Sequence, residues 1–120
     1  MEYSILLLDD NEELLELTKI NFESINHLKI LPFSDPVQAL RRIELYGLPH
    51  LIVTDFHLPG MNGIDFLTEV SRHYPVVAAI IFTATIRGLP ENCRYPAILK
   101  EAGSHERLLA MAKSILRLPA

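Results

Sequence analysis

Two of the apolar runs in this sequence lead directly to acidic residues. The run 51–53 leads, after one threonine, to Asp55, and the run 5–8 leads to Asp9 and Asp10. Short continuous apolar runs are typical of strands buried on both faces. In an open α/β sheet the carboxyl ends of such strands form the ligand crevice, so carboxylates there are placed for chemistry. Asp55 taken alone is better explained as the first residue of a turn, but the second acidic strand end favours a site.

Two further strand ends carry Thr83 and Lys100, and the five side chains together suggest phosphoryl transfer. Three carboxylates in one pocket repel one another by roughly 4 kcal/mol per pair at about 4 Å if the effective dielectric constant is about 20. A hard divalent cation offsets that repulsion, and Mg²⁺ fits best because it takes carboxylate, phosphate and water oxygens. Asp9, Asp10 and Asp55 are the candidate metal ligands. Lys100 can then pair with a phosphoryl oxygen, Thr83 can donate a hydrogen bond, and Asp55 is the candidate nucleophile.

Apolar runs that alternate with helical patterns predict a parallel sheet covered by helices on both faces. The expected strands are 5–8, 27–33, 51–55, 76–83 and 97–99. The second is less strictly apolar and contains Pro32, which suits a strand near the sheet edge. We predict an α/β fold, a doubly wound five-stranded parallel sheet with the flavodoxin-like strand order 2-1-3-4-5. In that order the first and third strands lie side by side at the switch point, so Asp9, Asp10 and Asp55 share one pocket.

Four helices are expected from the cap residues that precede helical patterns. The candidate N-terminal residues are Asp10, Asp35, Asn62 or Gly63, and Ser104. Their apolar stripes are expected to be Leu14, Leu17, Ile20 and Phe22; Val37, Leu40 and Ile43; Ile64, Leu67 and Val70; and Leu108, Met111, Ala112 and Ile115. Glycine and proline interrupt any pattern between Ile86 and Pro96, so the helix between the fourth and fifth strands is expected to be shortened or missing.

Length, composition and charge limit the classes of protein that this chain can belong to. Its 120 residues, 49% of them hydrophobic, predict a single domain over residues 1–120 with no output domain. The 11 basic and 15 acidic residues give a net charge of −4 and form no basic run, so no nucleic acid partner is expected. The N-terminus lacks a basic leader region and no apolar segment reaches the roughly 18 residues of a membrane span, which predicts a cytoplasmic protein without membrane contacts. Cys93 has no neighbours at zinc-site spacing.

From Ile5 to Leu118 the sequence resembles the receiver domain of two-component response regulators, the CheY-like proteins. The resemblance rests on Leu-Leu-Asp9-Asp10, on the run from Thr54 to Gly63, on Thr83-Ala84 and on Lys100 at a strand end. It implies that Asp55 accepts a phosphoryl group from a histidine kinase or a phosphotransfer protein. It also implies that the domain signals through contacts with a downstream protein target.

The resemblance assigns further roles within the expected pocket. Asp9, Asp10, Asp55 and the backbone carbonyl of His57 would hold Mg²⁺, whereas the His57 side chain is expected to be exposed. The only enzymatic activity implied is Mg²⁺-dependent self-phosphorylation and autodephosphorylation at Asp55. The small residue beside the phosphoryl group and the residues that shape the loop after the acceptor correspond to Ala84, Pro59 and Gly63.

The sequence departs from the family near its fifth strand. Ala97 stands where receiver domains commonly carry a tyrosine or phenylalanine, and an alanine has no rotamer to switch. Glu101 follows Lys100 in place of a proline with a cis bond. A cis bond before a residue other than proline costs about 3–4 kcal/mol, so we expect a trans bond or a strained one. The loop from Lys100 to Ser104 is also longer than in the family, which could aim the amine differently.

Three functions follow from the sequence. The first is a phosphorylatable, Mg²⁺-binding receiver, either standing alone or excised from a larger regulator or hybrid kinase. The second is a pseudo-receiver that acts as a phosphorylation-independent interaction module, which absent Mg²⁺ affinity and no acyl-phosphate formation would favour. Taken singly, Asp10 could be only a helix cap, Lys100 only a solvated lysine and Thr83 only a strand end. The third, a haloacid-dehalogenase-type phosphatase, is disfavoured because Asp9 is followed by Asp10 and Asn11 in place of the Asp-x-Asp motif.

Overall fold

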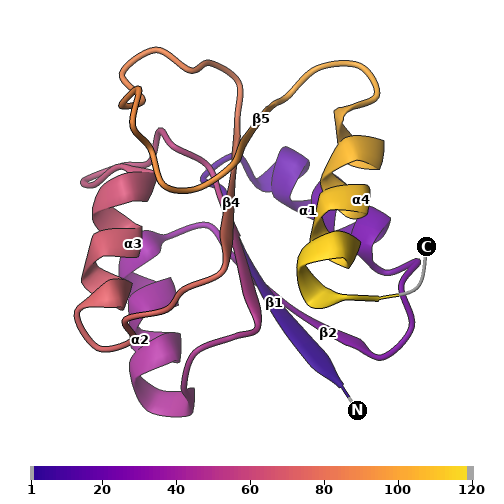
Figure 1. The fold of residues 1–120 in the computed structure, drawn as a ribbon, viewed down its shortest axis with the longest axis horizontal. Helices are drawn as coiled ribbons and strands as arrows, with labels where there is room; N and C mark the ends of the chain where they lie inside the picture. Colours follow the sequence, from indigo (N-terminus) through magenta and orange to yellow (C-terminus); the bar gives the residue numbers. More distant parts are fainter. Residues whose placement is uncertain (1, 119–120) are drawn as a thin grey trace.

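The computed structural model describes residues 2–118, which form a five-stranded parallel sheet with helices on both faces (Figure 1). The strands are β1 (Tyr3–Leu8), β2 (Leu28–Phe33), β3 (Leu51–Thr54), β4 (Ala79–Thr83) and β5 (Ala97–Leu99). The helices are α1 (Glu12–Phe22), α2 (Pro36–Tyr46), α3 (Gly63–Ser71) and α4 (Ser104–Leu116). The strand order is β2-β1-β3-β4-β5 and every pairing is parallel, so the predicted α/β class and order 2-1-3-4-5 are confirmed.

The sheet separates two apolar cores. Helices α2 and α3 cover one face and helices α1 and α4 cover the other (Figure 1). Ile5 and Leu7 of β1 pack on the α1 and α4 side, whereas Leu6 and Leu8 pack on the α2 and α3 side, and none is more than 1% exposed. Successive side chains of a strand point to opposite faces. A strand covered on both sides therefore reads as a continuous apolar run in the sequence.

The edge position predicted for β2 is correct, whereas β4 begins later than its apolar run predicts. Pro32 lies within β2, which is the edge strand as predicted. Strand β4 begins at Ala79, three residues later than the apolar run 76–82 suggests, and Val76 is 85% exposed. The Ile52 amide near the start of β3 donates to the carbonyl of Ala78 (3.0 Å). The hydrogen bonding between β3 and β4 therefore begins at Ala78, and the residues before Ala78 lie outside the paired part of the sheet.

Two of the predicted helix starts are confirmed and two are corrected. Asp35 caps α2, and Asn62 caps α3 in a capping box with Asp65. Helix α1 is capped by Asn11, whose Oδ1 accepts hydrogen bonds from the amides of Glu13 and Leu14, so the assignment to Asp10 is wrong. Ser104 is the first residue of α4 and not its cap; its Oγ accepts a hydrogen bond from the Glu101 amide (3.2 Å).

The predicted buried stripes are wrong at four positions. Leu17 (46%), Ile20 (54%), Val37 (61%) and Ile115 (36%) are exposed. Apolar residues occur on more than one side of these helices, so the sequence pattern alone does not select the side that meets the sheet. The residues that do face it repeat at three- and four-residue spacing and include small side chains. They are Leu15, Thr18 and Phe22 in α1; Pro36, Ala39 and Ile43 in α2; and Ser104, Leu108, Ala112 and Leu116 in α4.

Between β4 and β5 the described chain forms turns and bends without a helix, as the interrupted pattern predicts. Helix α4 of Figure 1 is the final helix, which follows β5. Among residues 2–118, no helix combines the length and the apolar composition that crossing a bilayer requires.

Candidate functional site

The carboxyl ends of four strands bring the predicted site residues to one edge of the sheet. Asp9 follows β1, Asp55 follows β3, Thr83 ends β4 and Lys100 follows β5. Backbone bonds continue the ladders past the strand ends, because the Asp55 amide donates to Leu8 (2.9 Å) and the Lys100 amide donates to Thr83 (2.8 Å). These hydrogen bonds fix the position, along the strand direction, at which each side chain begins.

Three carboxylates meet at this edge. Each of Asp9, Asp10 and Asp55 offers an oxygen, and these oxygens all lie within 4.8 Å of one another. Asp9 and Asp55 are buried, at 6% and 9% exposure, whereas Asp10 is exposed. The Asn11 amide donates to Asp9 Oδ1 (2.9 Å), which helps to fix the Asp9 carboxylate. The predicted gathering of these three residues is present in the structure.

Lys100 places its ammonium group between two of these carboxylates. Its Nζ donates to Asp9 Oδ2 (2.6 Å) and to Asp55 Oδ2 (2.8 Å), and its side chain is 9% exposed. Burial by itself would lower the pKa of the Lys100 ammonium, but the hydrogen bonds to Asp55 and Asp9 outweigh burial and raise it. The Lys100–Glu101 bond is trans. The altered loop after Lys100 therefore leaves the amine in the pocket.

The donor set of the pocket fits a hard divalent cation. Asp9, Asp10 and Asp55 supply only carboxylate oxygens, which Mg²⁺ prefers over nitrogen or sulfur. Burial raises the pKa of the Asp9 carboxyl, although the hydrogen bonds from Lys100 and Asn11 oppose this shift. A buried acid with a raised pKa is a group that a further positive charge would stabilise in its ionised form. The residues present thus fit a hard divalent cation such as Mg²⁺.

His57 and Thr83 lie at the site but differ in how they meet it. The backbone amide of His57 donates a hydrogen bond to Asp55 Oδ1 (3.2 Å), so the His57 backbone contacts the carboxylate. The His57 side chain is exposed to solvent, as predicted, and its ring packs edge-on against Phe56. Thr83 is fully buried, yet its Oγ1 donates to the carbonyl of Thr85 (3.1 Å) and not to a carboxylate. The Thr83 hydroxyl must exchange this bond before it can contact a group on Asp55.

Gly63 allows α3 to begin directly against the acceptor residue. The Gly63 amide donates to the carbonyl of Phe56 (2.7 Å), and a Cβ atom at this position would lie 2.4 Å from the backbone oxygen of Asp55. Thr54 Oγ1 donates to that same oxygen (2.8 Å), so the oxygen is held in place. The sequence identified Gly63 as a loop residue, whereas the structure shows that close packing requires it.

The sequence did not indicate which side chains pack behind Lys100. Its Nζ lies 5.6 Å from the centre of the Phe82 ring, a distance at which a cation is attracted to an aromatic face. His105 packs edge-on against Phe82, and its Nε2 lies 3.1 Å from Thr18 Oγ1. Burial and the charge of Lys100 both lower the pKa of His105. The spacing of these residues in the sequence gives no signal, since the contacts join α1, β4 and α4.

Comparison with known proteins identifies relatives of this chain. The family model for the response regulator receiver domain matches residues 5–90, which include the three carboxylates and Thr83 but end before β5. A protein-glutamate methylesterase/protein-glutamine glutaminase of Saccharophagus degradans is 33% identical over 89 residues, which are 73% of this chain and 25% of that protein. The chain spans about a quarter of the length of the curated relatives it matches.

Many solved structures share the fold, and two of them show the extent of the similarity. The chemotaxis response regulator CheY4 of Vibrio cholerae has a TM-score of 0.80 at 16% identity, over 96% of this chain and 99% of that one. The response regulator domain of Thermotoga maritima CheB has a TM-score of 0.77 at 20% identity, over 100% of both chains. At these identities the structures support the fold, and the sequence match supports the family. The chain therefore belongs to the response regulator receiver domains of two-component signalling.

Proposed function

We propose that this receiver domain accepts a phosphoryl group on Asp55 and that Mg²⁺ supports the transfer. The observation that carries the proposal is the Lys100 ammonium held between Asp9 and Asp55, with the three side chains between 9% and 11% exposed. A pocket that concentrates charges of both signs and excludes most water is one in which electrostatic stabilisation of a transferring phosphoryl group is strong.

In the proposed transfer, an Oδ atom of Asp55 attacks the phosphorus of a phosphohistidine. An O–P bond forms, the N–P bond breaks, and its electron pair stays on the imidazole nitrogen. Lys100 pairs with one phosphoryl oxygen, and the Thr83 hydroxyl donates to another in place of Thr85. Water later cleaves the acyl phosphate, releases inorganic phosphate and restores the Asp55 carboxylate.

Mg²⁺, when bound, would neutralise charge on the carboxylates and on the phosphoryl oxygens. The residues that would hold it are Asp9, Asp10, Asp55 and the backbone carbonyl of His57. The donor would be a histidine kinase or a phosphotransfer protein, and the output would be a contact with a downstream protein. These partners are inferred from membership of the family, because the described residues form the pocket but do not identify what binds there.

Ala97 favours a second candidate, an interaction module that works without phosphorylation. Ala97 is exposed on β5 and has no side-chain rotamer, so it cannot follow a movement of Thr83 as an aromatic ring would. Tyr95, the aromatic residue nearest to Ala97 in the sequence, packs against the core beside α2 and α3. A domain with this arrangement can present a constant surface to a partner.

The intact mass of the protein separates the two candidates. The protein is incubated with acetyl phosphate, with and without Mg²⁺, alongside the variants Asp55→Asn and Asp35→Asn. The second variant is the control, because asparagine keeps the helix cap of α2 at a site away from the pocket. We expect one phosphoryl group to be added only with Mg²⁺, in the wild type and in Asp35→Asn but not in Asp55→Asn. No adduct under any condition would refute phosphorylation and support the interaction module.

A further inference from the structure

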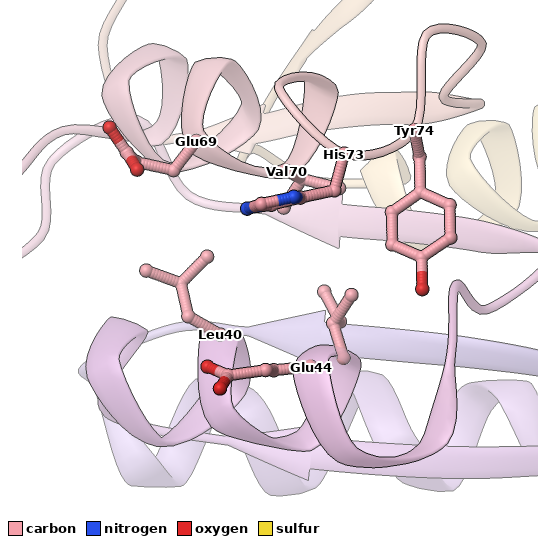
Figure 2. Close-up of a pocket in the computed structure, with 7 residues that line it drawn as sticks. Leu40, Glu44, Glu69, Val70, His73 and Tyr74 are labelled. Atoms are coloured by element: carbon pink, nitrogen blue, oxygen red, sulfur yellow. The ribbon is translucent and has the colours of Figure 1, made fainter.

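A pocket between α2 and α3 lies away from the carboxylate cluster. It has a volume of about 450 Å³ and is lined by residues from the middle and C-terminal part of α2, from the end of α3 and from the turn after α3 (Figure 2). We call it the α2–α3 pocket; its lining residues are Leu40, Ile43, Glu44, Glu69, Val70, His73 and Tyr74. Helices α2 and α3 run back from the edge of the sheet that carries Asp55, so the pocket lies near the opposite edge.

The floor of the α2–α3 pocket is apolar and its wall is aromatic. Ile43 and Val70 are buried, and Leu40 is half-buried beside them. Figure 2 shows Tyr74 extending from the α3 side toward α2, the His73 ring lying along the gap beneath α3, and Leu40 rising from α2 on the opposite side. A volume of this size lies in the range of about 300–1,000 Å³ that is typical of ligand sites. An occupant needs an aliphatic or flat group to contact these surfaces.

Two acidic residues, Glu44 and Glu69, line the pocket, and Arg72 lies beside it. Within residues 2–118, Glu44 forms no salt bridge, and Glu69 pairs only with Arg72 at 3.4 Å on the exposed surface. Neither α2 nor α3 has a basic residue in its last turn, whereas α1 carries Lys19 and α4 carries Lys113 there. The C-terminal end of a helix is the negative end of its dipole and attracts cations. Arg72, the C-cap of α3, supplies a positive charge at the end of that helix, so α2 is the helix of the pocket whose last turn and C-cap carry no basic residue.

We propose that the α2–α3 pocket binds a basic segment of a partner protein, with an arginine between Glu44 and Glu69. The aliphatic part of the arginine would lie on the floor, and its planar guanidinium would stack on His73 or Tyr74. A nucleic acid would be repelled by the two carboxylates. A metal ion is disfavoured, because among the described residues only the oxygens of Asp9, Asp10 and Asp55 converge closely enough to hold one.

The apolar surface extends beyond the pocket along α2. Val37 is 61% exposed and stands three residues before Leu40 and seven before Glu44, which places all three on one side of the helix. This strip is about 10 Å long, at about 1.5 Å per residue. A partner segment that follows it would place apolar side chains near Val37 and Leu40 and its arginine near Glu44.

A matched pair of peptides tests this proposal. The probe is a fluorescein-labelled helical peptide of about 14 residues with leucine at every third or fourth position and arginine beside each leucine. The control peptide carries citrulline, the neutral isostere, in place of each arginine. Binding is measured by fluorescence anisotropy and located by amide chemical shifts in the wild type, in Glu44→Lys/Glu69→Lys and in the control Glu16→Lys, an exposed position on α1. If the double lysine variant does not fold, binding is measured with the milder variant Glu44→Gln/Glu69→Gln in its place.

We expect the arginine peptide to bind at least about tenfold more tightly than the citrulline peptide, with shifts at Leu40, Val70 and His73. Charge reversal should weaken it at least about tenfold, and Glu16→Lys should change it by less than about twofold. Equal affinity for both peptides, shifts confined to Asp9 and Asp55, or no binding would overturn the proposal. Because Asp55→Asn should bind the peptide as the wild type does, this test is independent of phosphorylation.

Discussion

Replacing Lys100 by methionine tests how strongly the buried amine holds the site together. Its contacts with Asp9 and Asp55, at 2.6 and 2.8 Å, correspond to about 6 kcal/mol each at an effective dielectric constant of about 20. Most of this is offset by the loss of water around three charges. Methionine removes the attraction but leaves two carboxylates buried, and breaking a buried ion pair in this way costs about 3–5 kcal/mol.

We expect the lower end of that range, about 3 kcal/mol, because the three side chains keep about a tenth of their surface in contact with water. For a domain of this size that loss corresponds to a fall in Tm of about 12 °C, at about 4 °C per kcal/mol. Lys29→Met is the matched control, since Lys29 is exposed on the edge strand β2. It should change the free energy of unfolding by less than about 0.5 kcal/mol.

Unfolding in urea, followed by circular dichroism, measures both variants with EDTA and with Mg²⁺. In the Lys100→Met variant a cation can bind the carboxylates without displacing the amine, so Mg²⁺ should stabilise this variant more than the wild type. At a Mg²⁺ concentration about 100 times the dissociation constant the gain is about 2.7 kcal/mol, enough to close most of the gap. The reasoning is refuted if Lys100→Met and Lys29→Met are equally stable in EDTA, or if Mg²⁺ leaves their difference unchanged.

Three further predictions follow from the local geometry. Gly63→Ala should cost about 1–3 kcal/mol and slow phosphorylation, because the new Cβ would lie 2.4 Å from the Asp55 backbone oxygen; an unchanged urea midpoint would contradict this packing. Asn11→Ala should cost about 1 kcal/mol of stability and Asp10→Ala much less, since Asn11 caps α1; thermal unfolding of both variants identifies the cap. The folded state raises the pKa of Lys100 above its ordinary value of 10.5. While the carboxylates are ionised, its stabilisation is therefore fully present below about pH 10.5 and is lost as the pH rises through the folded-state pKa, so the stability difference between wild type and Lys100→Met should shrink in strongly alkaline urea titrations.

The sheet could be predicted from the sequence because burial on both faces leaves a strong pattern. Four consecutive residues of β1, from Ile5 to Leu8, and three of β3 are apolar for the same reason, namely that helices cover both sides. Once these strands are adjacent and parallel, the residues that follow them must meet at one edge. The positions of Asp9 and Asp55 follow from that topology without knowledge of any side-chain contact.

The helix starts and stripes were harder to predict because neighbouring residues compete for the same role. Asp10 and Asn11 are both good cap residues. In the structure the side chain of Asn11 caps α1, and its backbone amide donates a hydrogen bond to the Asp9 carboxylate. The cap and the site are therefore formed by one turn. Likewise α1 has leucines at 14, 15 and 17, and only the path of the chain from β1 decides that Leu15 meets the sheet.

Lys100 shows why the site tolerates departures that alter the surrounding loop. Its amide is bonded to the Thr83 carbonyl in the ladder between β4 and β5, so the strand fixes where its side chain begins. The residue that replaces the family's proline, Glu101, has its amide bonded to Ser104 Oγ and its carboxylate paired with Arg107, both away from the carboxylate cluster. A side chain at a strand end is positioned by the residues before it, and changes after it are absorbed by the loop.

The proposed phosphoacceptor pocket is held by backbone hydrogen bonds, whereas the route by which it would signal is not. Every group that would contact the phosphoryl oxygens lies on or directly after a strand and is held by ladder hydrogen bonds. The route outward from Thr83 has no such support, since its hydroxyl is bonded to Thr85 in a segment without helix, and Ala97 offers no ring to move. A phosphoryl group that draws the Thr83 hydroxyl away must therefore release Thr85 first. We therefore expect a change caused by phosphorylation to begin in the chain between β4 and β5, and not in the packing of β5.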